Sequence, residues 1–195
     1  MDNAQAFKDK FVDYEYCVCS NAFPGKVKVV KALPGNYLHL VGVNTSISAD
    51  AFFKKCLMGT LTENDFDFSK RGVGKNVLKG AVRDKIRVLP NMVSIFFDTS
   101  IKVQPNFNKN QITCAFATSD SACTLGFAQS GHPKSLLNGD YLDANNTYDV
   151  DGIFRRRTGT TEFYDKLWVV DSKISEYGDE LRRYLSEELY QKMFA

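Results

Sequence analysis

The sequence predicts an α+β fold in which one antiparallel β-sheet packs against helices. Residues 26–33 alternate charged and apolar side chains, as a half-buried strand does, whereas residues 48–58 carry apolar residues at helical spacing. Three short apolar runs, at 93–98, 112–118 and 122–129, then follow one another and are typical of strands. This succession favours an antiparallel sheet of about four to six strands with helices beside it.

The first half of the chain supplies a helix, a strand and a hairpin before the helix at 48–58. The helix is predicted over residues 2–12, and EYCVCS at 15–20 is a candidate strand. The turn LPGN joins the strand at 26–33 to a second strand at 37–42, so that the two form a hairpin. In that hairpin His39 lies on the face opposite Leu38 and Leu40.

The second half predicts a helix over 75–89, the three strands and a late strand at 167–172. Residues 131–162 are polar and rich in turn residues, which predicts a long irregular excursion. Residues 174–193 carry apolar side chains on one helical face and predict a C-terminal helix. We expect residues 1–195 to form a single domain.

The composition argues against a membrane-spanning or secreted protein, and the overall charge does not indicate a particular partner. The chain is 44% hydrophobic, which suffices for a core, and its formal net charge is +2. No run of about 18 apolar residues is present, so we expect no membrane span. The first residues lack the pattern of a secretion signal, and five cysteines without an export signal are typical of a reducing compartment. We therefore expect a cytoplasmic protein.

Basic residues are concentrated in two segments. Residues 70–87 hold seven basic residues and one acidic residue, and a stripe recurs every fourth residue, formed by Lys75, Lys79, Arg83 and Arg87. Lys85 breaks this pattern, because its position falls inside the apolar arc of the helix. A second cluster is formed by Arg155, Arg156 and Arg157. Both clusters could hold nucleic-acid phosphates, or they could be only a solvated helix face and a soluble turn.

Familiar cofactor and metal motifs are incomplete. RGVGKN lacks the glycine spacing and the hydroxyl residue of a P-loop, and the cysteines include no CxxC pair. DANNTYDVDG has Tyr148 where a calcium loop of the EF type needs glycine. We expect no metal ligands and no cofactor.

Three segments carry a resemblance to a known family. HLVG at 39–42, with the helix SADAFFKKCLMGTLTENDF after it, resembles a motif of phage-borne nucleases. VRDKIRVLPNM and CTLGFAQSGHPKSLLNGD are similar to two later motifs of the same family. This family is the fourth phage class of the Barnase–EndoU–colicin–RelE (BECR) fold, and the resemblance covers about residues 26–137 and the strand at 167–172. It implies a barnase- and RelE-like core over about residues 13–172, with the helix 174–193 as an extension.

The resemblance implies a toxin-like endoribonuclease that needs no metal. A ribose 2′-hydroxyl would attack the neighbouring phosphate, which requires proton transfer and a cation at the phosphorane. We expect His39 to transfer protons, Lys85 to stabilise the phosphorane and Ser135 to position the phosphate. The basic stripe and the three arginines would hold flanking phosphates. From the residues alone, His39 could instead be a half-buried structural histidine and Ser135 a helix or turn cap, while His132 fits a turn.

The sequence is also compatible with two other classes of function. The same fold could be a binding module that holds RNA or a protein without cutting, as a decoy or immunity-type protein would. Nucleotide or ADP-ribose transfer would need a nicotinamide pocket, and no motif marks one. The expected partners are RNA, such as tRNA or mRNA, and an inhibitor or immunity protein, with no membrane.

Overall fold

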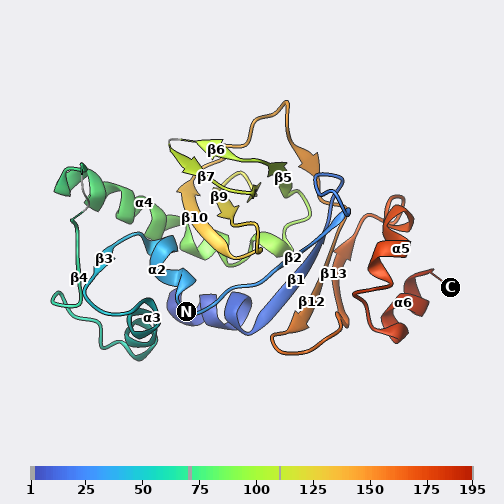
Figure 1. The fold of residues 1–195 in the computed structure, drawn as a ribbon, viewed down its shortest axis with the longest axis horizontal. Coiled ribbons are helices and arrows are strands. Elements are labelled where there is room, and N and C mark those ends of the chain that lie inside the picture. Colours follow the sequence, from blue (N-terminus) through green and yellow to red (C-terminus); the bar gives the residue numbers. More distant parts are fainter. Residues whose placement is uncertain (1–2, 70–71, 110, 195) are drawn as a thin grey trace.

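The structure is a computed structural model, and it describes residues 3–69, 72–109 and 111–194. Helices and antiparallel strands make up the fold, so the predicted α+β class is confirmed. The strands form two main sheets, not the single sheet that was predicted (Figure 1). None of the helices described is long and apolar enough to cross a membrane.

The four-stranded sheet joins the two ends of the chain. Its order is β13-β12-β1-β2, with all neighbours antiparallel. Tyr14 pairs with Arg157 and Cys19 with Gly152, so an early strand and a late strand form the centre of the sheet. The bounds are Tyr14–Cys19 for β1, Val27–Val30 for β2, Gly152–Arg157 for β12 and Asp165–Val169 for β13.

The five-stranded sheet has the order β10-β9-β8-β5-β11. Its strands are β5 (Lys102–Pro105), β8 (Phe116–Ser119), β9 (Cys123–Phe127), β10 (Pro133–Asn138) and β11 (Tyr148–Asp149). Two short ladders accompany the sheets, and they pair β3 (Asn44–Thr45) with β4 (Phe66–Asp67) and β6 (Asn108–Lys109) with β7 (Ile112–Thr113).

The two sheets meet where the turn between β9 and β10 touches β2. Gly131 has φ = +82°, and a Cβ atom built on it would lie 2.2 Å from the carbonyl oxygen of Val29. The amide of Lys31 donates to the carbonyl oxygen of Gly131 at 3.3 Å. Only glycine satisfies both the left-handed backbone and this close approach.

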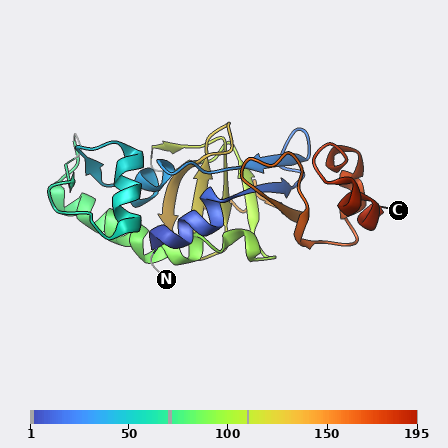
Figure 2. The same ribbon diagram turned by 90° about the horizontal axis from the view of Figure 1, so that it is seen from below.

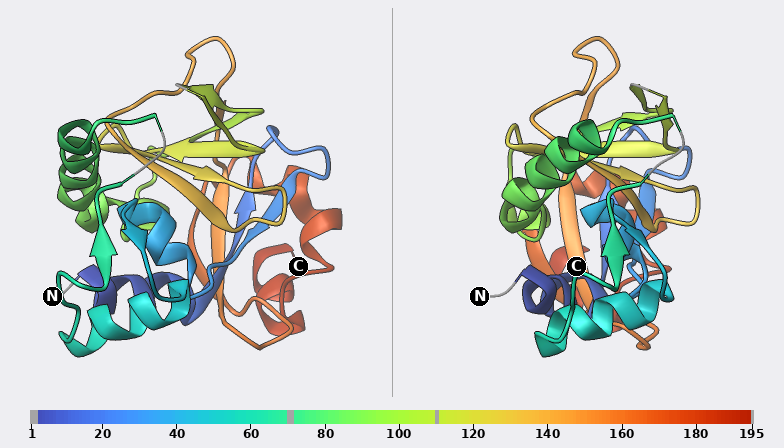
Figure 3. Two further views of the ribbon diagram at one scale, coloured as in Figure 1. Left: turned by 60° about the vertical axis from the view of Figure 1, so that its left-hand side comes forward. Right: turned by 90° about the vertical axis from the view of Figure 1, so that its left-hand side faces the viewer.

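Helices from the first half of the chain pack on the five-stranded sheet and on one another. They are α1 (Asn3–Phe7), which continues as the π-helical turn η1 (Lys8–Val12), α2 (Asn36–Val41), α3 (Ala49–Met58) and α4 (Lys75–Met92). The hydroxyl of Ser48 accepts a hydrogen bond from the amide of Ala51 and so caps the N-terminus of α3. Both α2 and α4 pack against β10 (Figure 3).

Aromatic rings fill the space between the sheets and the helices. Tyr16 of β1 lies 4.6 Å from Phe96, centroid to centroid, and Phe116 of β8 stacks on Phe127 of β9 at 4.7 Å. Phe11 contacts both Tyr16 and Phe96. This core uses one face of the four-stranded sheet, and a second apolar cluster covers the other face.

The C-terminal segment forms that second cluster, but not as one helix. Residues 174–193 contain the 3-10 helix η3 (Ile174–Tyr177) and the helices α5 (Gly178–Leu181) and α6 (Glu187–Phe194), so the single helix predicted there was wrong. The amide of Phe163 donates to the carbonyl of Tyr184, and the amide of Ser186 donates to the carbonyl of Phe163. These two hydrogen bonds form a β-bridge between Phe163 and Leu185, and this bridge separates α5 from α6. The two helices lie at the opposite end of the molecule from α3 (Figure 2).

Three other predictions were wrong for related reasons. The strand predicted at 37–42 is instead the helix α2, in which Tyr37, Leu40 and Val41 are buried at helical spacing. The strand predicted at 93–98 is instead a short 3-10 helix, η2 (Ile95–Phe97). The carbonyl of its Phe96 accepts a hydrogen bond from the Trp168 ring N–H at 3.0 Å. The irregular excursion predicted at 131–162 instead includes the strands β10, β11 and β12. Polar and charged side chains in these strands hid the alternation that would have predicted them.

Candidate active site

A cavity of about 580 Å³ opens between α2, α4 and the ladder β3–β4. His39 and Lys85 line it together with the polar residues Asn44, Thr45 and Ser69. Its apolar wall comes from α4, β7 and β10 and includes Leu78, Val82, Ile112 and Leu137. The cavity therefore combines an apolar wall with a polar and basic rim.

His39 lies in the last turn of α2 with its side chain exposed. The predicted strand would have placed it beside Tyr37 and Val41, but those two side chains are buried and His39 points away from them. Among the residues that the structure describes, the His39 side chain makes no hydrogen bond or ion pair. The imidazole is therefore accessible to a ligand in the cavity.

Lys85 reaches across from α4 to the end of α2. Its Nζ atom donates to the carbonyl oxygen of His39 at 3.3 Å, and this carbonyl is one of those left without a helical partner at a C-terminus. Gly42 caps α2 with φ = +82°, and a Cβ atom there would lie 2.8 Å from Nζ. Glycine thus ends the helix and leaves room for the ammonium group.

The contact gives Lys85 a structural use and leaves its ammonium group at the cavity. A cation at the C-terminus of a helix is favourable, because the peptide dipoles leave partial negative charge there. The same ammonium lines the cavity that His39 lines. Although its position falls inside the apolar arc of α4, the Lys85 side chain extends to the cavity and to the end of α2.

The wall formed by β3 and β4 is held by two aspartates. Asp67 accepts hydrogen bonds from Asn44 and from both the amide and the hydroxyl of Ser69, and these bonds lower the pKa of its carboxyl group. Asp65 accepts from Lys55 at 2.6 Å and from the amide and hydroxyl of Thr62. The ammonium of Lys55 is the largest cause that lowers the pKa of Asp65 to about 2. Neither aspartate was singled out from the sequence.

Ser135 lies near the site without lining it. It is buried on β10 and pairs with Gly126 of β9. Leu137, two residues further along the strand and on the same face, reaches the cavity. Ser135 lies within the strand β10, so the structure does not support the alternative that it caps a helix or a turn.

The basic stripe lies on the flank of α4 next to the cavity. The cavity is lined on α4 by Leu78, Ala81, Val82 and Lys85, whereas Lys75, Lys79, Arg83 and Arg87 are exposed around the helix from it. Arg87 forms an ion pair with Asp84 at 3.3 Å. Lys79 and Arg83 instead border a separate shallow groove with Phe68.

The arginines of β12 are not brought to the cavity. Arg155 donates to Asp165 of β13 at 2.5 and 3.0 Å, and its guanidinium lies 4.4 Å from the centre of the Tyr14 ring. Arg156 donates to Glu15 of β1 at 2.5 and 2.8 Å. Arg157 is exposed at the end of the strand, 5.6 Å from the centre of the Tyr14 ring. Arg155 and Arg156 thus hold neighbouring strands together.

The second histidine lies in a turn, as predicted. His132 follows Gly131 between β9 and β10, and its Nδ1 lies 2.7 Å from the hydroxyl of Ser130. Burial and the nearby charge of Lys31 lower the pKa of its imidazole. It does not line the cavity that holds His39.

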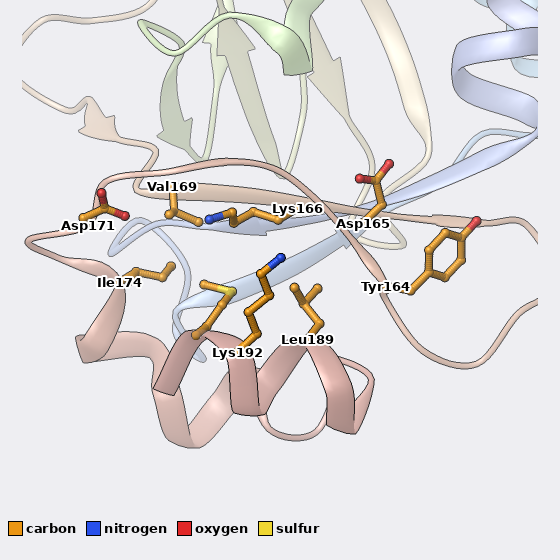
Figure 4. A pocket seen from close by; sticks show the side chains of 9 residues that line it. Tyr164, Asp165, Lys166, Val169, Asp171, Ile174, Leu189 and Lys192 are labelled. Carbon is orange, nitrogen blue, oxygen red and sulfur yellow. The ribbon is translucent and has the colours of Figure 1, made fainter. Parts of the chain in front are cut away.

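A second groove, of about 420 Å³, lies between β13 and α6. Lys166 of β13 and Lys192 of α6 line it together with Leu189 (Figure 4). It holds no histidine, and its Asp165 is engaged by Arg155. Within the described ranges, no three His, Cys, Asp or Glu side chains gather as a metal-binding group. This groove therefore lacks the imidazole that lines the cavity beside Lys85.

Of three comparisons with known proteins, one finds a match, and it agrees with the fold. No curated protein matches the chain, and no solved structure matches it either. The family model described as phage-Barnase-EndoU-ColicinE5/D-RelE like nuclease 4 matches residues 1–179 of the 195. This match includes His39, Lys85 and every strand of both sheets, and it ends before α6. The chain belongs to this family of phage nucleases.

Proposed function

We propose that the protein is an endoribonuclease whose site is the cavity lined by His39 and Lys85. One observation carries the proposal: two residues 46 positions apart, each suited to phosphodiester cleavage, meet at one cavity. The imidazole is exposed, and the ammonium is held within hydrogen-bonding distance of the same residue's carbonyl.

The residues divide the reaction between them. The ribose 2′-oxygen forms a bond to phosphorus as its proton passes to the His39 imidazole, and the bond from phosphorus to the 5′-oxygen breaks. The leaving 5′-oxygen takes a proton from the imidazolium or from water. Lys85 supplies positive charge where the phosphorane develops negative charge. A cleavage of this kind needs no metal, because the ammonium performs the electrostatic part.

The walls of the cavity suit a single unpaired nucleotide. Leu78, Val82 and Leu137 offer apolar surface to a base, while Asn44, Thr45 and Ser69 offer hydrogen-bonding groups to its edge or to the sugar. Ser135 supports β10 beneath this wall and would position the phosphate only through Leu137 and the strand. The basic flank of α4 would hold phosphates on either side.

The biological setting is part of the same proposal. A ribonuclease of phage origin is expected to act as a toxin in the cytoplasm, on an RNA such as tRNA or mRNA. A protein inhibitor would be its natural partner. We also propose that the 195 residues form one domain, since the core between the sheets draws on segments from both halves of the chain.

The experiment is incubation of the purified protein with total RNA in the presence and absence of EDTA, followed by mapping of new ends. We expect ends that carry a 2′,3′-cyclic phosphate and a 5′-hydroxyl, and we expect them to persist with EDTA. Activity that EDTA abolishes and magnesium restores would contradict the mechanism. RNA binding without any cleavage would favour the non-catalytic binding module instead.

A further inference from the structure

A shallow groove of about 350 Å³ runs along the outer flank of α4, next to the active-site cavity. It is lined by Phe68, Lys79, Val82, Arg83 and Ile86. Val82 lines the cavity as well, so the same helix turn separates the two depressions. A chain leaving the cavity over Val82 would enter this groove.

The lining of the groove is apolar and cationic, without any acid. Phe68 and Ile86 form its floor, and Ile86 is 45% exposed although it is a large apolar side chain. Lys79 and Arg83 border it, and neither forms an ion pair within the part of the chain that the structure describes. Arg87, one helical turn beyond Arg83, does form such a pair with Asp84 and does not line the groove.

A flat ring beside two cations matches the two parts of a nucleotide. Bases stack on aromatic side chains with little dependence on sequence, and lysine and arginine bind the phosphates between them. The ammonium of Lys79 already lies 5.3 Å from the centre of the Phe68 ring. A base that takes this place on the ring would release the ammonium toward the adjoining phosphate.

We propose that this groove is a subsite for a nucleotide that flanks the cleaved bond. Its base stacks on Phe68, and Lys79 and Arg83 hold its phosphate. This assignment rests on the proposed function, because it places the reacting nucleotide in the neighbouring cavity. An acidic helix of a protein partner is the other occupant with suitable charge, but such a helix needs a longer groove with anchors on successive turns.

The test uses RNA that cannot be cut, with 2′-O-methyl groups that block attack by the 2′-oxygen. Dinucleotides and oligonucleotides lengthened at either end are titrated by fluorescence anisotropy against the intact protein, Phe68→Leu, Arg83→Ala and Arg87→Ala. For the intact protein we expect affinity to rise when the oligonucleotide is lengthened on one side. Phe68→Leu should lower affinity for the longer RNA about ten-fold and leave the dinucleotide unchanged.

Arg83→Ala should weaken binding and reduce the slope of log affinity against log salt by about 0.7, the value for one phosphate contact on a single strand. Arg87→Ala is the matched control and should change both quantities much less. Equal losses for the two arginines with no loss for Phe68→Leu would overturn the subsite, since the flank would then act as a diffuse basic surface. Affinity independent of length in the intact protein would overturn it too.

The design separates this inference from the function on which it rests. If the groove behaves as expected but natural RNA is never cut, the catalytic assignment fails and the binding subsite stands. If RNA is cut at the cavity with no dependence on length or on Phe68, the subsite fails alone. Thermal unfolding of each variant identifies losses caused by misfolding, and Lys79→Gln, on the surface of α4, then tests the groove without altering its apolar floor.

Discussion

The basic flank of α4 and the arginines of β12 look alike in the sequence and differ in the structure. On β12, Arg155 and Arg156 each donate two hydrogen bonds to one carboxylate on a neighbouring strand. On α4, Lys79 and Arg83 border a groove that holds no acid. Arg155 and Arg156 therefore form ion pairs within the protein, whereas Lys79 and Arg83 are available to bind a partner.

This difference shows that a cluster of basic residues predicts an interface only when its counter-ions are known. The acids that engage Arg155 and Arg156 are Asp165, ten residues away, and Glu15, about 140 residues away. A paired guanidinium contributes little to the external field, because a carboxylate cancels its charge at short range. Of these two segments, α4 therefore presents more positive charge without a nearby carboxylate.

The largest expected effect is the loss of cleavage in His39→Ala. Removal of a proton-transfer group typically lowers the rate by about 10²–10⁴-fold. We expect the variant to fold normally and to bind RNA with little change, because the His39 side chain is exposed. Cleavage assays beside circular dichroism would check this. A destabilised variant that keeps full activity per folded molecule would show that the ring has only a structural role.

Lys85→Met should lower cleavage by about 10²–10³-fold, as expected for the loss of one group that stabilises a transition-state charge. It should also cost some stability, because the carbonyl of His39 loses its partner at the end of α2. Lys85→Arg is the conservative control that keeps the charge. If Met and Arg variants cut RNA as well as the intact protein, Lys85 serves only to cap α2.

Arg156→Ala should reduce stability and leave RNA binding unchanged. The Arg156 and Glu15 side chains are only 18% and 12% exposed, so removal of one leaves the other charged and poorly solvated. We expect a loss of about 2–3 kcal/mol, or roughly 5–10 °C in Tm for a chain of this size. Arg157→Ala, on the exposed neighbour, is the matched control. A selective loss of RNA affinity in Arg156→Ala would break the comparison between β12 and α4.

The smallest expected effect is an acid-dependent loosening of the cavity wall. The pKa of Asp65 is lowered to about 2 in the folded protein, so its ion pair with Lys55 stabilises the fold above the ordinary pKa of aspartate. This contribution is lost as pH falls from about 4 toward 2. Asp65→Asn should lower Tm slightly at pH 7 and flatten the dependence of Tm on pH over that window. An unchanged acid profile in Asp65→Asn would contradict this assignment.

The sequence predicted that His39 and Lys85 lie near each other, but it did not predict the element that carries His39. It paired His39 with Lys85 through the family motifs, and the structure places both at one cavity. It placed His39 in a strand, however, because a short apolar run fits both periods. The signal for a helix was Gly42, a left-handed cap directly after the run.

What the sequence could not predict depends on contacts between distant segments. The strands β10 and β12 begin with Pro133 and Gly152 and contain charged residues, so their patterns resemble loops until their neighbours are known. The break between α5 and α6 requires Phe163, which bonds to residues 184 and 186. The Phe68 groove likewise needs α4 beside it.

The pairing of β1 with β12 has a consequence for folding during synthesis. Tyr14 pairs with Arg157, so 143 further residues must be made after Tyr14 before its partner exists. At typical rates of synthesis that wait lasts roughly 7–30 s. During this time the β1–β2 hairpin can form, but one of its edges is unpaired and available to other chains. The newly made protein therefore depends on late residues to pair this edge of β1, and slow folding is expected from so distant a contact.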